Sequence, residues 1–273
     1  MILNHFEGER FEILTDLIYI LLFLTLGLTL SSLFGIIIHR IPNSVAIVKV
    51  ANFCPNCKVN LKKINMIPVV SYLRLGGKCN NCKEKISLKY PAIEILIPVI
   101  FVFLYLFYGI GLDLFLNLAF WSMLFITFLI DLEHMVVSDA VLIAFSPAVI
   151  VYIVSTEATF TAHLIGFLVG FAFFLVIYLL TKFIYKQEGF GFGDVMLSGT
   201  VGWFLGFENV ILTNILSFLI AFIVIVFLKI LGKSMKRDME IPFAPFICIS
   251  AAIASLFGEE IISLYWGISS SWI

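Results

Sequence analysis

Charged residues are scarce in this sequence. Asp, Glu, Lys and Arg make up 13% of its 273 residues, whereas hydrophobic residues make up 62%. A soluble domain of this composition would expose much of its apolar surface to water, which argues against that class. The mean hydropathy of +1.11 instead predicts a helical protein that turns its apolar side chains toward lipid. The net charge of −1 gives no support for a nucleic-acid partner.

The first apolar run, at residues 17–38, lacks the features of a secretory signal peptide. It is too long for the core of such a peptide, it follows acidic residues, and it has no small-residue cleavage site. We therefore expect a retained transmembrane helix. Later runs predict an all-α polytopic membrane protein with seven to eight transmembrane helices; they lie at residues 92–109, 112–130, 139–155, 160–185, 195–207, 209–231 and 241–257.

Lys and Arg are missing from alternate loops. None occurs in the loops at residues 109–112, 155–162 and 207–209. Sixteen of the 17, all except Arg10, lie in three segments, at residues 40–89, 182–186 and 229–237. With the N-terminus outside, the positive-inside rule places all three segments in the cytoplasm. We expect a multi-pass protein of the inner (cytoplasmic) cell membrane, in contact with lipid, in which the short run 195–207 also crosses.

Two aspartates stand at the predicted cytoplasmic ends of apolar runs. Asp131 closes one run and Asp194 opens another. Ionisable groups at such positions are costly to desolvate, so they are rare without a function. Two carboxyls in a partly dry site cannot both ionise cheaply, so we expect them to share a proton. The ionised carboxyl could then activate a water, and the protonated one could assist at a peptide carbonyl. The alternative is a pair of solvated helix ends.

Three glycines, Gly189, Gly191 and Gly193, precede the second aspartate. Residues without a Cβ atom would let a substrate backbone come close and let the chain turn sharply before a helix. This short pattern is weak evidence alone, because small residues are common in membrane helices. His163, near the expected outer face, has no partner that the sequence identifies.

The sequence contains only five cysteines, and four of them form two Cys-x-x-Cys pairs in the polar segment 39–91. These are Cys54, Cys57, Cys79 and Cys82. The spacing approximates a four-thiolate structural zinc site, and disulfide bonds are the alternative. A cytoplasmic location favours reduced thiols and therefore zinc. The segment has few large apolar residues, so a metal ion would supply stability that a core cannot.

Together these segments resemble the type IV prepilin peptidase family. The matching segments keep one order between Phe34 and Phe246, and they lie at residues 54–57, 67–73, 77–82, 86–94, 130–134, 189–194 and 241–246. The resemblance implies a membrane aspartic endopeptidase that cleaves the basic leader of type IV prepilins or pseudopilins on the cytoplasmic side. It assigns Asp131 and Asp194 as the catalytic pair and the four cysteines as zinc ligands. Many such enzymes also methylate the new N-terminus with S-adenosylmethionine.

We expect three regions: an N-terminal segment with the first helix at residues 1–38, a cytoplasmic zinc-binding insertion at 39–91 and a membrane-embedded peptidase core at 92–273. A proton-coupled transporter could also use paired aspartates, but it would not require the cysteines, and no internal repeat is visible. A presenilin-like protease with other substrates is a second alternative. A non-enzymatic zinc-bearing scaffold of a secretion machine is a third.

Overall fold

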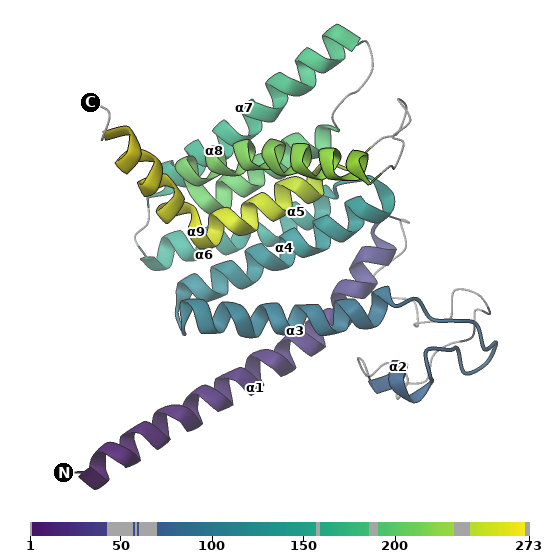
Figure 1. Cartoon of the computed structure of the whole chain (residues 1–273), viewed down its shortest axis with the longest axis vertical. Coiled ribbons are helices and arrows are strands. Elements are labelled where there is room, and N and C mark those ends of the chain that lie inside the picture. Colours follow the sequence, from purple (N-terminus) through teal and green to yellow (C-terminus); the bar gives the residue numbers. More distant parts are fainter. Residues whose placement is uncertain are drawn as a thin grey trace. The chain divides into compact units, whose positions relative to one another are not determined.

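The computed structural model describes residues 2–42, 57, 59, 70–156, 159–185, 191–231 and 241–270. Regular structure within these ranges is helical, apart from one isolated bridge between Lys78 and Lys85. The chain divides into two compact units, Met1–Leu114 and Phe115–Ile273 (Figure 1). The prediction of an all-α fold is confirmed.

The first unit pairs two long helices, α1 (Ile2–Arg40) and α3 (Lys89–Tyr108), and contains the short helix α2 (Val70–Arg74). Gly27 lets α1 approach α3 closely, because a Cβ atom there would lie 2.5 Å from the Cα of Pro98. Further along, the Tyr105 hydroxyl donates a hydrogen bond to Asp16 Oδ1 at 2.9 Å. The acidic residue before the first apolar run therefore has a partner on the neighbouring helix.

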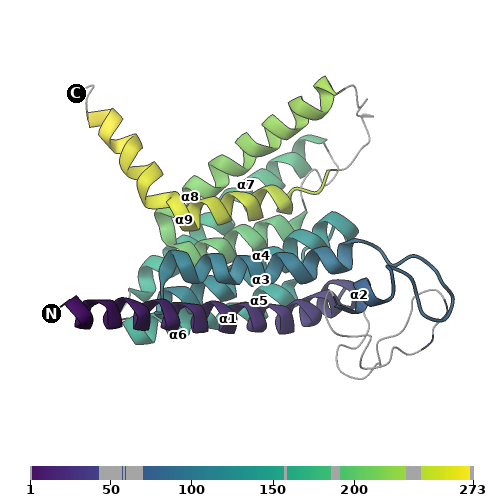
Figure 2. The ribbon, with the colours of Figure 1, turned by 60° about the horizontal axis from the view of Figure 1, so that its bottom comes forward.

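The second unit contains most of α4 and five further helices (Figure 2). Their bounds are α4 Leu112–His134, α5 Asp139–Phe145, α6 Pro147–Thr156, α7 Phe160–Tyr185, α8 Phe192–Ile230 and α9 Ala244–Ser270. The helices α5 and α6 together form one apolar span that is long enough to cross a membrane.

The helix α8 is two helical halves that turn back on each other at Gly206. This glycine has φ 78° and ψ −175°, which is outside the helical region and in the range that glycine adopts easily. The Ser198 hydroxyl donates to Asn214 Oδ1 at 2.9 Å. In one straight helix these residues would be about 24 Å apart, so the halves must run antiparallel. The runs 195–207 and 209–231 therefore form two separate helical segments, as the sequence predicted.

Glycines bring α7 close to the first half of α8. A Cβ atom at Gly202 would lie 2.0 Å from the backbone oxygen of Gly166, and one at Gly170 would lie 2.3 Å from that of Ser198. Such close approach between small residues is typical of helix packing inside membranes, where dispersion contacts replace the hydrophobic effect. The contact holds the N-terminal part of α8 firmly against α7.

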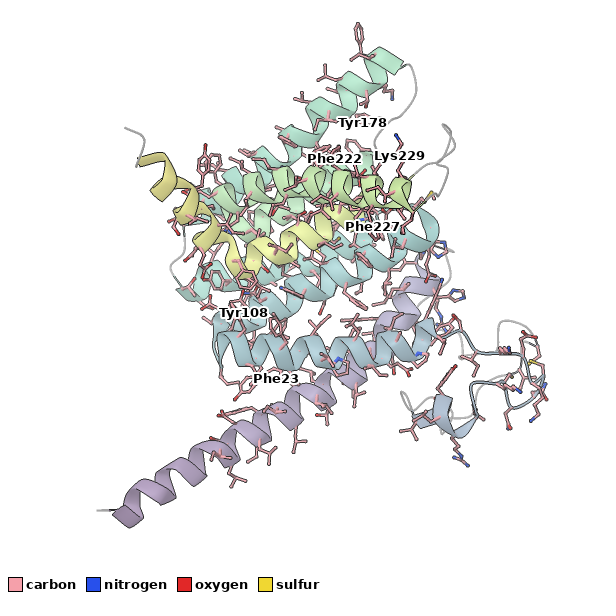
Figure 3. The ribbon with its side chains drawn as sticks, in the orientation of Figure 1. Phe23, Tyr108, Tyr178, Phe222, Phe227 and Lys229 are labelled. Atoms are coloured by element: carbon pink, nitrogen blue, oxygen red, sulfur yellow. The ribbon has the colours of Figure 1, made fainter. Side chains whose placement is uncertain are left out.

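Seven helices in the described part of the chain are long and apolar enough to cross a membrane, with α8 counted once. Since α8 doubles back, its two halves agree with the seven to eight spans expected from the sequence. Apolar side chains on the second half of α8 point outward, including Phe222 at 64% exposure and Phe227 at 58% (Figure 3). This surface suits lipid rather than water. The chain is a multi-pass membrane protein.

Candidate active site

Asp131 lies in the last turn of α4. The helix ends three residues later at His134, and Met135 adopts a left-handed conformation with φ 53°. The Met135 amide donates to the Asp131 backbone oxygen at 2.9 Å, which closes this end of the helix. The Asp131 side chain is only 5% exposed. The backbone N–H of Ala244, at the start of α9, donates a hydrogen bond to its carboxylate.

Asp194 lies in the first turn of α8, three residues after the N-cap residue Gly191. Its side chain is 7% exposed, and its carboxylate accepts a hydrogen bond from the Gly191 backbone N–H. A carboxylate at this position reaches back to the N-cap amide in the way a capping box does. The positive end of the helix dipole also favours a negative charge there.

The structure brings the two aspartates together. The rings of Phe120 and Phe204 stack with centroids 4.9 Å apart, eleven residues before Asp131 and ten residues after Asp194. Since the two carboxyls also interact with each other, α4 and the first half of α8 are antiparallel, with both carboxyls at the same end. The two carboxyls interact electrostatically with each other, and both act on the buried thiol of Cys248 in α9. Three helices thus enclose one acidic site.

The glycines before Asp194 have different surroundings. A Cβ atom at Gly193 would lie 2.7 Å from the Val137 Cβ, so this glycine lets α8 begin directly against the segment that follows α4. A Cβ atom at Gly191 would have ordinary room, its nearest neighbour being Asp194 Oδ2 at 3.7 Å. Gly189 lies outside the described residues. The close approach at Gly193 helps to bring the carboxyl-bearing ends of α4 and α8 together.

His163 has a structural partner that the sequence did not identify. Its Nδ1 lies 2.9 Å from the backbone oxygen of Trp203, to which it donates a hydrogen bond. Because the helix breaks at Gly206, the last carbonyls of the first half of α8 lose their usual partners. His163 therefore stabilises the turn at Gly206, where the first half of α8 ends. This turn is remote from the carboxyls.

Three of the four predicted zinc ligands are described, and they lie together. The sulfur atoms of Cys57, Cys79 and Cys82 lie within 4.8 Å of one another, and they could hold a metal ion. Cys54 lies outside the described residues. The Cys57 and Cys79 sulfurs are 4.0 Å apart, too far for a disulfide bond. Tetrahedral zinc with bonds of about 2.3 Å to sulfur places thiolates about 3.8 Å apart, so this spacing fits.

A tight turn presents Cys79 and Cys82 on the same side of the chain. The Cys79 amide donates to the Glu84 backbone oxygen at 2.8 Å, and the Lys83 amide donates to that of Cys79 at 3.1 Å. Lys83 takes a positive φ of 61°, which lets the chain reverse after the second cysteine. The short pairing beside the cysteines thus shapes the turn that carries Cys79 and Cys82.

Sequence comparison places this arrangement among known proteins. Residues 25–108 match the family model of the bacterial peptidase A24 N-terminal domain. Residues 118–226 match the model of the type IV leader peptidase family. The second match includes both Asp131 and Asp194, whereas the first includes the whole cysteine-bearing segment.

Curated relatives match over most of their length. A prepilin leader peptidase/N-methyltransferase of Bacillus subtilis is 32% identical, over 88% of this chain and 94% of the relative. A protein with the same name from Legionella pneumophila is 34% identical over 79% of this chain and 75% of the relative. A relative with this name from Vibrio cholerae is 29% identical over 87% of this chain and 96% of the relative. No solved structure was found to match this chain.

Proposed function

This chain belongs to the type IV leader peptidase family, and from that membership we propose that it cleaves the leader peptide of type IV prepilins or pseudopilins. We further propose that it methylates the N-terminal amine that cleavage exposes, with S-adenosylmethionine as the methyl donor. Its relatives carry both activities in their names. The substrate would be a membrane-anchored protein with a short basic leader.

In the proposed mechanism, Asp131 and Asp194 act as a proton-sharing pair. Both carboxyls are more than nine-tenths buried, and they interact with each other. Close carboxyls in a dry site hold one proton between them, so one can act as a base while the other acts as an acid. The base deprotonates a water that attacks the scissile carbonyl carbon. The acid donates to the carbonyl oxygen, and the departing amine takes up a proton as the peptide bond breaks.

One observation supports this proposal above all: two carboxyls 63 residues apart in the sequence lie buried at the same end of antiparallel helices. Burying two carboxyls beside each other is costly, and a helix end in lipid does not require it. A proton-coupled transporter would also tolerate such a pair. The family to which this chain belongs and its cysteine cluster favour the peptidase.

The charge distribution supports an orientation for the enzyme in the inner membrane. If each apolar run crosses once, the three segments that carry 16 of the 17 Lys and Arg share one side of the membrane with Asp131 and Asp194. The positive-inside rule assigns those ends to the cytoplasm and the N-terminus to the outside. We therefore propose that cleavage takes place at the cytoplasmic boundary of the membrane, before the pilin is assembled.

Mass spectrometry of a co-expressed type IV prepilin tests both activities at once. We expect the pilin to lose its basic leader and to gain the mass of one methyl group at the new N-terminus. A pilin that keeps its leader in cells with the membrane-inserted protein would contradict the peptidase assignment. A cleaved pilin without the methyl group would contradict only the methyltransferase assignment.

We also propose that Cys57, Cys79 and Cys82, with Cys54 as the fourth ligand, hold a structural zinc ion. Four thiolates would saturate the ion, so it would stabilise the segment and take no part in peptide hydrolysis. We predict about one zinc per wild-type chain and much less in Cys79→Ser, as measured by elemental analysis of the purified protein. Cys248→Ser removes a thiol outside the cluster and should keep its zinc. Full zinc content in Cys79→Ser would rule out this site.

A further inference from the structure

Six buried side-chain atoms have no hydrogen-bond partner among the described residues, and all six belong to the unit that holds the carboxyls. Four of them are Thr127 Oγ1, Asp131 Oδ2, Asn214 Nδ2 and Ser250 Oγ. The other two are His134 Nε2, at the end of α4, and Asn209 Oδ1, beside the turn at Gly206. A buried polar atom without a partner costs free energy, more so where lipid replaces water. A ligand that supplies hydrogen bonds would remove that cost.

Thr127 and Ser198 lie one helical turn deeper than the carboxyls. Thr127 precedes Asp131 by four residues on α4, so the two side chains share a helix face. Ser198 follows Asp194 by four residues on α8 and has the same relation to it. Because the two helices are antiparallel with their carboxyls at one end, both residues reach the same depth, about 6 Å below the carboxyls.

Asn214 reaches this depth from the second half of α8. Its Oδ1 accepts a hydrogen bond from the Ser198 hydroxyl at 2.9 Å, which fixes the orientation of its amide. The amide nitrogen Nδ2 then carries two N–H donors, and it is buried without a partner in the described part of the chain. Asn214 is 1% exposed, and Ser198 is 0% exposed.

Ser250 reaches the same depth from α9. This helix runs antiparallel to α4, because the Trp121 indole donates to the Ser255 hydroxyl at 3.1 Å while the Ala244 amide binds the Asp131 carboxylate. Ser250 lies between these two contacts on α9, and Thr127 lies between them on α4. We name Thr127, Ser198, Asn214 and Ser250 the polar layer.

We propose that the polar layer is a water-binding site, one turn beneath the carboxyls, that holds water for the hydrolytic reaction. The inference rests on the proposed peptidase function. The side chains offer the complementary groups that bound water requires: the amide of Asn214 donates, the hydroxyls of Thr127 and Ser250 donate or accept, and Asp131 Oδ2 accepts. Buried water commonly makes about three such bonds. A water held here is adjacent to the carboxyl pair and shielded from lipid.

Thr127→Val tests the site because it exchanges a hydroxyl for a methyl group at nearly constant volume. We expect kcat for prepilin cleavage to fall about tenfold, equivalent to about 1.4 kcal/mol. KM should not change, because the substitution removes a bound water and leaves the contacts with the substrate intact. The thermal stability should stay the same or rise, since an unpartnered buried hydroxyl has been removed. Thr127→Ser keeps the hydroxyl and should restore most of kcat.

The matched control is Thr213→Val on α8. Thr213 is 0% exposed, and its hydroxyl donates to the Asn209 backbone oxygen at 2.7 Å within its own helix. The same substitution there should leave kcat near the wild-type value. If Thr127→Val also cleaves at the wild-type rate while the wild type cleaves and Asp131→Asn does not, the water site is wrong and the peptidase assignment stands.

A second measurement does not depend on cleavage. X-ray radiolysis turns bound water into hydroxyl radicals that oxidise the nearest side chains. Cys248 is 3% exposed and interacts electrostatically with both carboxyls, so we expect its thiol to be oxidised by water in the polar layer. Its oxidation should fall at least severalfold in Thr127→Val and remain unchanged in Thr213→Val. Equal oxidation of Cys248 in both variants, or none in the wild type, would overturn the proposal.

Discussion

Asp131→Asn and Asp194→Asn should each abolish leader cleavage. The amide has the size of the carboxyl but can neither accept the proton of water nor share one with its neighbour. General acid and base catalysis contributes about 10²–10⁴-fold, so we expect a loss of about 10³-fold or more in either variant. The fraction of cleaved prepilin, measured by mass spectrometry or gel mobility over time, gives the rate. Both aspartates are more than nine-tenths buried, and Asn also removes an unfavourable buried charge, so folding should survive.

The control for these variants is Asp139→Asn. Asp139 lies in the first turn of α5 and is exposed. The substitution makes the same chemical change there, outside the buried carboxyl pair. We expect it to cleave at the wild-type rate. Zinc content and membrane insertion of all three variants should match the wild type. Wild-type cleavage by either Asp131→Asn or Asp194→Asn would reject the carboxyl pair as the catalytic centre.

Gly202→Ala should destabilise the protein strongly, although it adds only one methyl group. The added Cβ would lie 2.0 Å from the Gly166 backbone oxygen and 2.5 Å from its carbonyl carbon. Since both obstacles are backbone atoms, no change of rotamer relieves the clash, and α7 must move away from α8. Overpacking of this kind costs about 3 kcal/mol or more at its upper end. For a chain of this size we expect the unfolding temperature to fall by about 6 °C or more.

The matched control is Gly35→Ala in α1. A Cβ atom at Gly35 would meet no heavy atom within 4 Å, so the same substitution should leave the unfolding temperature unchanged or raise it slightly. Intrinsic fluorescence during heating of both detergent-solubilised variants provides the comparison. An unfolding temperature for Gly202→Ala equal to that of the wild type would contradict the close packing of α7 on α8.

The carboxyl pair could be predicted from the sequence because membrane topology is a one-dimensional property. Apolar runs predict the spans, and the positions of Lys and Arg predict which ends face the cytoplasm. These two patterns predicted a common membrane boundary for Asp131 and Asp194 before their helices were known to be neighbours. Which helices lie beside each other depends on side-chain packing. Only contacts in the folded structure, such as that of Phe120 with Phe204, identify the neighbouring helices.

The glycines before Asp194 show a feature that the sequence alone cannot predict, namely which neighbour occupies the space beside a glycine. We expected Gly189, Gly191 and Gly193 to admit a substrate backbone, and this remains a prediction. The space beside Gly193 is taken by Val137, a residue of the same chain. A glycine that receives a substrate and one that receives a neighbouring helix look identical in a sequence, because both are defined only by the atom they lack.

The sequence by itself determined that this protein is a polytopic helical membrane protein of a known peptidase family, and it predicted paired carboxyls at one membrane boundary. Hydrophobicity, charge and motif spacing act along the chain, so they can be read from it directly. The tertiary structure alone decided that α8 reverses at Gly206, that His163 binds the Trp203 carbonyl, and that Ser198 binds Asn214 across the two halves of α8. These features arise from the register between helices far apart in the chain, which no local pattern encodes.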